Sequence, residues 1–232
     1  MDVWQLVIVG VVSAPLLAQA PVRLREQLRL DGTQLDLRGT NATDEDLREV
    51  GAPEFSRVTA VLLSGTQVGD AGLAYLARLP LRQLDLGRTQ VTDAGLAQLR
   101  TLPLERLELT GTKVTDAGLT HLKALPLLML VLRDTKINGA GLAALEGFDL
   151  RVLDLSHTIV TDASVGALEK VKRIGTLDLS DTRITNQAVP HLARIAGLST
   201  VDLAGTAVGP EAVARLKRSR PQLNVVTARP VR

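Results

Sequence analysis

The chain has 232 residues, of which 45% are hydrophobic and only 2% aromatic, so its core must consist mainly of leucine, valine and alanine. Its 27 basic and 25 acidic residues nearly cancel to a net charge of +2, which argues against a dedicated nucleic-acid surface. The absence of cysteine excludes disulfide and thiol chemistry but does not identify the redox compartment.

Residues 1–20 form an apolar segment that ends in the small-residue triplet Ala18-Gln19-Ala20. The segment is similar to a signal peptide, so we expect an exported protein that is periplasmic, extracellular or associated with the envelope. Asp2 stands where basic residues are usual, and Pro21 would hinder cleavage at the triplet. An uncleaved membrane anchor is therefore the main alternative, because about 18 apolar residues lie at the lower limit for a bilayer crossing. A helix that merely caps the rest of a cytoplasmic protein is a third interpretation.

From residue 34 onward one pattern recurs, in which a threonine follows an LxL triplet. These threonines are Thr40, Thr66, Thr89, Thr112, Thr135, Thr158, Thr182 and Thr206, with steps of 26, 23, 23, 23, 23, 24 and 24 residues. Internal similarity at so regular a period is typical of a solenoid made of stacked repeats.

One unit, residues 84–103, reads LDLGRTQVTDAGLAQLRTLP. Leu84 and Leu86 alternate as in a strand, whereas Leu96, Leu99 and Leu102 recur at helical spacing. Each unit is thus expected to be a short strand, a turn and a short helix. The few leucines of one unit cannot offset the entropy of ordering about 23 residues, so stability must come from stacking the units.

These repeats resemble the leucine-rich-repeat family, with the signature LxxLxLxxTxVTDAGLxxLxxLP over about residues 34–223. The likeness is greatest to bacterial repeats similar to the cysteine-containing repeats of F-box adaptor proteins and to ribonuclease-inhibitor-like proteins. The resemblance implies an α/β fold, a curved right-handed horseshoe segment with parallel inner strands and short outer helices. It also implies that the threonines form a ladder in which each hydroxyl caps backbone groups. It indicates little about function, because members of the family bind unrelated partners.

The regular units divide the chain into four parts. We assign residues 1–20 to the signal peptide or anchor, 21–57 to an N-terminal cap with an atypical first repeat, 58–213 to regular repeats and 214–232 to a C-terminal cap. Terminal units of a repeat array are expected to be atypical because one of their faces meets water.

The recurring VTDAGL segment predicts how each helix begins. Thr92 and Asp93, like Thr115 and Asp116, are expected to accept amide hydrogens of their own helix and to place negative charge at its N-terminus. The glycine that follows recurs at one place in the middle copies, where we infer close packing between adjacent helices.

Alternate strand residues point away from the core and stack into columns about 4.8 Å apart. The column between the two leucines reads Asp36, Leu62, Asp85, Glu108, Val131, Asp154, Asp178 and Asp202, which predicts an acidic stripe on the concave face. Arg106 and Arg133 are expected to offset part of its repulsion. This stripe indicates either a surface for a basic protein segment or a cation, or only the common form of the repeat with solvated aspartates.

A second column, just before the threonines, reads Gly39, Gly65, Arg88, Gly111, Asp134, His157, Asp181 and Gly205. His157 is therefore predicted to lie between two aspartates, where proton transfer or metal binding is one hypothesis and ordinary surface ion pairs the other. The residues expected to contact a partner are Asp85, Glu108, Arg133, Asp134, Asp154, His157, Asp178, Asp181 and Asp202.

The sequence favours a non-catalytic protein-interaction module that recognises a protein partner through the concave face. We expect a monomer without cofactor, resident metal, nucleic acid or catalytic residues, and contact with a membrane only through an uncleaved N-terminal segment. The alternatives are a structural spacer of the cell envelope and an adaptor subunit resembling the F-box leucine-rich-repeat proteins.

Overall fold

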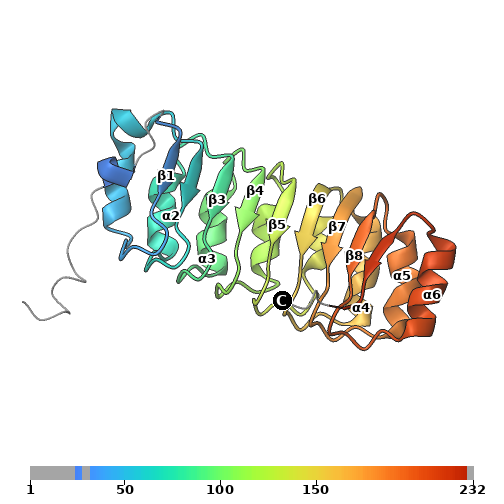
Figure 1. The fold of residues 1–232 in the computed structure, drawn as a ribbon. Coiled ribbons are helices and arrows are strands. Elements are labelled where there is room, and N and C mark those ends of the chain that lie inside the picture. Colours follow the sequence, from blue (N-terminus) through green and yellow to red (C-terminus); the bar gives the residue numbers. More distant parts are fainter. Residues whose placement is uncertain (1–23, 28–31, 229–232) are drawn as a thin grey trace, which may run out of the picture.

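The computed structural model describes residues 24–27 and 32–228. The repeats lie side by side in an elongated array, with strands along one side and helices along the other (Figure 1). The apolar segment 1–20 lies outside the described residues. None of the helices in the described ranges has the length and apolarity that a bilayer crossing requires.

Nine parallel strands of the described chain form one sheet whose spatial order follows the sequence order. The strands are β1 Gln34–Asp36, β2 Ala60–Leu62, β3 Gln83–Asp85, β4 Arg106–Glu108, β5 Met129–Val131, β6 Asp149–Asp154, β7 Arg173–Asp178, β8 Thr200–Asp202 and β9 Asn224–Val226. Each copy pairs with the next in the same register, so that Leu84 lies between Val61 and Leu107. The parallel inner strands expected from the repeat pattern are thus confirmed.

The helical side combines short α-helices with 3-10 turns. The α-helices are α2 Asp70–Leu76, α3 Asp93–Leu96, α4 Asp162–Val165, α5 Val189–Arg194 and α6 Pro210–Ser219. The 3-10 segments are η1 Leu24–Gln27, η2 Asp46–Gly51, η3 Pro53–Phe55, η4 Ala97–Leu99, η5 Gly118–Leu122, η6 Leu142–Leu145, η7 Gly166–Lys170 and η8 Asn186–Ala188. The helix expected to continue through Leu102 ends earlier, because α3 passes into η4, although Leu102 remains buried beyond it.

The core lies between the sheet and the helical side and runs the length of the array. Strand leucines such as Leu84 and Leu107 meet helix leucines such as Leu96 and Leu119, all of them inaccessible or nearly so. At the C-terminal end α6 turns a charged face to solvent, and Arg220 donates to the carbonyls of Ala193, Ile195 and Leu198. This guanidinium therefore caps backbone carbonyls of the preceding repeat.

The threonine ladder lies where each strand turns toward the helical side. In every copy the threonine Oγ1 donates to the carbonyl oxygen three residues earlier, over distances of 2.5 to 2.7 Å. The six middle threonines, Thr66 to Thr182, are buried. The capping role implied by the family resemblance is confirmed.

A second ladder, the aspartate ladder, joins each helix start to the next repeat. Asp70 accepts from the backbone N–H and the hydroxyl of Thr92 at 2.8 and 2.6 Å, and Asp93 accepts from the same two groups of Thr115. Related contacts join Asp44 to Gly69, Asp116 to Asn138, Asp162 to Thr185 and Asn186 to Gly209. The expectation that each aspartate caps its own helix is therefore wrong, whereas the threonine does so: Thr92 accepts from Ala94 N–H.

The recurring glycine makes room for this ladder. A Cβ on Gly95 would lie 2.4 Å from Asp70 Oδ1, and a Cβ on Gly118 would lie 2.3 Å from Asp93 Oδ1. The close packing inferred at this position is thus real, and its immediate partner is the aspartate of the preceding repeat. In a later repeat Ser164 replaces the glycine, and its hydroxyl donates to the carbonyl of Asn138.

We predict that Thr112→Val lowers the free energy of unfolding by about 1 kcal/mol, because the buried carbonyl of Leu109 loses its hydroxyl donor while side-chain volume is kept. Thr206→Val is the matched control, since Thr206 is only half-buried and ends the ladder. Urea unfolding of both variants measures the difference. Equal effects in the two would contradict a contribution that depends on burial.

Gly95→Ala should lower the free energy of unfolding by about 1 to 3 kcal/mol, because the new methyl group overlaps Asp70 and separates it from Thr92. Gly51→Ala is the control, since the nearest atom to its added Cβ is Arg78 Nη1 at 3.9 Å. The control is expected to change stability by less than about 0.5 kcal/mol. Thermal or urea unfolding of the pair would refute the steric explanation if both variants were equally stable.

Candidate functional site

The acidic column runs along the concave face in the register expected from the repeats. Strand pairing places in one row Asp36, Leu62, Asp85, Glu108, Val131, Asp154, Asp178, Asp202 and finally Val226. The helices pack on the opposite side of the sheet (Figure 1), so this row faces away from them. Leu62 and Val131 interrupt the carboxylates, which leaves Asp154, Asp178 and Asp202 as three acidic residues on adjoining strands.

Each carboxylate of the acidic column also has a local structural role. Asp154 Oδ1 accepts from Ser156 N–H and Asp178 Oδ1 from Ser180 N–H, both at 2.8 Å. The same contact to the backbone N–H two residues later recurs at Asp36, Asp85, Glu108 and Asp202. These bonds satisfy amides where the strand ends, so the fold itself favours a carboxylate here.

The basic residues near the acidic column differ in their contacts. Arg133 donates to the hydroxyl of Ser156 at 3.1 Å. Arg38 forms an ion pair with Asp36 of the column, and its guanidinium lowers the pKa of that carboxyl. Arg106 lines one hollow together with Asp85 and Glu108, whereas the Arg38–Asp36 pair at the N-terminal end was not predicted from the sequence.

Two carboxylates of the column carry a raised pKa. Burial raises the pKa of Glu108, although hydrogen bonds from Thr110 act in the opposite direction. Burial likewise raises the pKa of Asp202, and the nearby negative charge of Asp178 adds to the effect. Glu108 lies in a shallow hollow of about 200 Å³ over β3 to β5, where Met129 and Val131 provide apolar lining.

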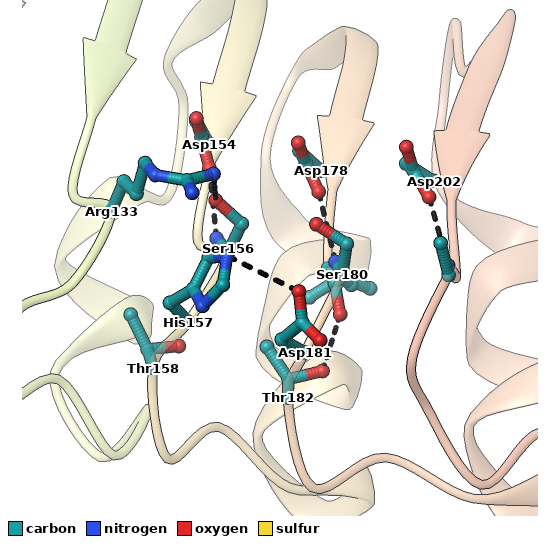
Figure 2. A network of polar contacts seen from close by, with 12 residues as sticks. Arg133, Asp154, Ser156, His157, Thr158, Asp178, Ser180, Asp181, Thr182 and Asp202 are labelled. Atoms are coloured by element: carbon teal, nitrogen blue, oxygen red, sulfur yellow. Dashed lines mark hydrogen bonds and ion pairs between the residues drawn. The ribbon is translucent and has the colours of Figure 1, made fainter. Parts of the chain in front are cut away.

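The second column marks a left-handed turn in every repeat. Arg88, Asp134, His157 and Asp181 each have φ of 54°, and glycines with positive φ occupy the other copies. His157 Nε2 lies 3.1 Å from Asp181 Oδ2 of the next repeat, as Figure 2 shows. His157 thus contacts one of the two expected aspartates, and Asp134 occupies the equivalent turn of the preceding repeat.

The polar groups around His157 form separate pairs. Within the described ranges, no group of three or more His, Asp or Glu side chains is arranged to hold a metal ion, so the geometry gives the metal hypothesis no support. Ser156 is fully buried and its hydroxyl accepts from Arg133, while the imidazole of His157 pairs with Asp181 (Figure 2). The serine and histidine are therefore engaged separately.

The repeat sequence identifies the fold that presents the acidic column. A family model described as Leucine Rich repeat matches residues 80–99, which include β3 and α3. The fold is a leucine-rich-repeat solenoid. Folds of this kind typically serve as protein-interaction modules, whereas the comparisons identify no particular partner.

Solved structures share this leucine-rich-repeat fold at low sequence identity. An internalin from Listeria monocytogenes is 18% identical over 86% of this chain, with a TM-score of 0.65, and the match covers 55% of the internalin chain. A leucine-rich-repeat protein from Leptospira interrogans is 17% identical over 83% of this chain, with a TM-score of 0.59 and 54% of its own chain covered. The chain thus spans about half the length of these two proteins. A comparison with curated proteins found no match.

We predict that Glu108→Gln raises the free energy of unfolding at pH 7 and that this gain shrinks as the pH falls toward 4.5. The folded-state pKa of Glu108 is above its ordinary value, so the folded protein gains stability on protonation and loses it as pH rises through the folded-state pKa. The glutamine retains an oxygen that can accept from Thr110 N–H. Urea unfolding at several pH values tests this, and an offset independent of pH would contradict it.

Proposed function

We propose that this leucine-rich-repeat chain is a non-catalytic recognition module that binds a protein partner through its concave face. The observation that carries the proposal is the in-register acidic column on the side of the sheet opposite the helices. A partner that presents basic side chains along an extended segment would match this face in charge and in spacing.

The C-terminal half of the acidic column suits such a partner best. Asp154, Asp178 and Asp202 lie on adjoining strands, so their side chains recur at about 4.8 Å. Each uses Oδ1 for a backbone amide, so Oδ2 is the oxygen that would bind a basic group of the partner. Asp134, His157 and Asp181 on the neighbouring turns, together with Arg133, would form the border of the contact area.

The remaining features of the proposal come from the sequence. We propose an exported monomer that acts in the periplasm, outside the cell or at the envelope, with any membrane contact made through residues 1–20. An adaptor subunit related to the F-box type of repeat is an alternative, for which the cytoplasm would be the location. The division into caps and regular repeats at residues 57 and 213 belongs to the same proposal.

The structural spacer is the main competitor, and one observation favours it. Every carboxylate in the acidic column accepts a backbone N–H, so the fold would retain these residues even without a partner. A test must therefore remove the negative charge and keep the acceptor. Aspartate to asparagine does this, because the amide oxygen can still accept the same N–H.

The decisive experiment compares capture of proteins from native lysate and envelope fractions by the full chain and by a variant with Asp154, Asp178 and Asp202 changed to Asn. We expect a partner that the parent retains and the variant loses. Basic proteins should dominate, and binding should weaken as ionic strength rises because the contacts are exposed ion pairs.

The matched control changes Glu45, Glu49 and Glu211 to Gln, which alters the net charge equally at exposed sites away from the concave face. This control should retain the partner. If the parent, the variant and the control capture the same proteins, or none, the acidic column is only a feature of the repeat. The spacer would then be the better account.

A further inference from the structure

The edge of the sheet where strands begin is irregular between β5 and β6. Earlier repeats approach their strands through a Leu-Pro pair, at Leu79-Pro80, Leu102-Pro103 and Leu125-Pro126. The next repeat has Phe148 and Asp149 instead, preceded by Gly147 at φ of 82°. The strand that follows, β6, begins at Asp149 and has six residues, whereas β5 has three. The start of β6 therefore projects beyond the start of its neighbour.

The projecting start of β6 pairs with β7 on one side. Asp149 and Leu150 are in register with Arg173 and Ile174, whereas pairing with β5 begins only at Val152 and Met129. Within the described chain, no strand lies beside Asp149 on the β5 side, because the β5 register continued backward leads to the turn at Pro126.

Hydrogen bonds fix the direction of the free edge. Arg173 N–H donates to the carbonyl of Phe148, while Arg151 N–H donates to Leu128 on the β5 side at 2.7 Å. Asp149 pairs in register with Arg173, whose N–H reaches the Phe148 carbonyl, so the paired groups of Phe148 and Leu150 face β7 and those of Asp149 face the β5 side. The N–H and C=O of Asp149 thus point toward the space beside β5, as a strand edge that can accept another backbone.

An apolar hollow lies at this edge. It has a volume of about 360 Å³ and is lined by Leu125, Pro126, Leu127, Leu128, Phe148 and Asp149, among others. Leu128 is half-buried and occupies a position where the neighbouring repeats have Glu105 and Arg151. The hollow therefore coincides with an apolar side chain at a place that is otherwise charged.

The charges around the hollow favour an anionic neighbour. Asp149 lines the hollow, but Arg173 and Lys172 pair with it and lower its pKa, so its negative charge is already compensated. Lys123 at the rim and exposed Arg151 beside Leu128 then outnumber the remaining acid, Glu146. A carboxylate placed next to an apolar side chain would meet this excess of positive charge.

We infer that this edge is a second binding site, separate from the concave face, for an extended peptide segment that carries an apolar side chain beside an acidic one. The peptide backbone pairs with Asp149 by strand addition, its apolar side chain enters the hollow against Leu128 and Phe148, and its carboxylate faces Lys123 and Arg151. The inference does not depend on the proposed function.

Selection of random eight-residue peptides displayed on phage tests it, with the full chain as the target and Leu128→Glu and Leu128→Arg as paired controls. Both variants should fold, because glutamate and arginine occur at the equivalent positions 105 and 151. We expect enriched peptides with an apolar residue next to an acidic one, and about tenfold weaker binding to either variant, since the fully buried contact of one aliphatic side chain is lost. If Leu128→Arg weakens binding as Leu128→Glu does, the lost apolar contact explains the effect and the charge introduced at residue 128 does not.

Two measurements on a synthetic copy of an enriched peptide locate its backbone. Binding should shift the Asp149 amide resonance and slow its hydrogen exchange, and N-methylation of the one peptide amide that pairs with Asp149 should abolish binding. The inference is overturned if no peptide is enriched, if both Leu128 variants bind as well as the parent, or if N-methylation at every position is tolerated. Peptides lost instead by the Asp154, Asp178 and Asp202 variant would refute this site and favour the concave face.

Discussion

The spacing of hydrogen-bonded parallel strands governs the rest of this structure. Adjacent strands lie about 4.8 Å apart, whereas a helix with its side chains is about 10 Å wide. Repeats that pair strand to strand on one side therefore have too little room for full helices on the other. The side opposite the strands therefore contains very short α-helices such as α3 and 3-10 turns such as η5 and η6. The same crowding explains why Gly95 and Gly118 lie against the aspartate of the preceding repeat.

Features that repeat within one unit could be predicted from the sequence. The period placed the leucines in the core, the threonines in a ladder and the acidic residues in one row, because a fixed register turns each repeat position into a column. The aspartate ladder was missed because its partner lies in the next repeat, 22 residues away. Considered within one repeat, the aspartate of VTDAGL is expected to cap the helix that it begins. The stacking of repeats shows that Asp70 instead accepts from Thr92 of the next repeat.

The candidate site was predictable in its position and less so in its contacts. Strand period placed Asp154, Asp178 and His157 on one face, but the choice of partner depends on side-chain direction, which periodicity does not specify. Arg133 thus binds Ser156, which the sequence did not predict, whereas the contact of His157 with Asp181 follows the predicted column. The hollow beside β6 had a weak sequence signal, the change from Leu125-Pro126 to Phe148-Asp149, whose effect on strand length depends on pairing with β7.

The left-handed turns limit which residues suit the backbone at these positions. Four repeats meet this backbone requirement with glycine, which adopts it freely, whereas Arg88, Asp134, His157 and Asp181 adopt it with a side chain attached. A side chain in this conformation costs about 1 kcal/mol or more per residue, and asparagine and aspartate tolerate it best. Folding alone would thus favour glycine at all eight turns. The side chains of Arg88 and His157 at these turns therefore do not follow from the backbone requirement itself.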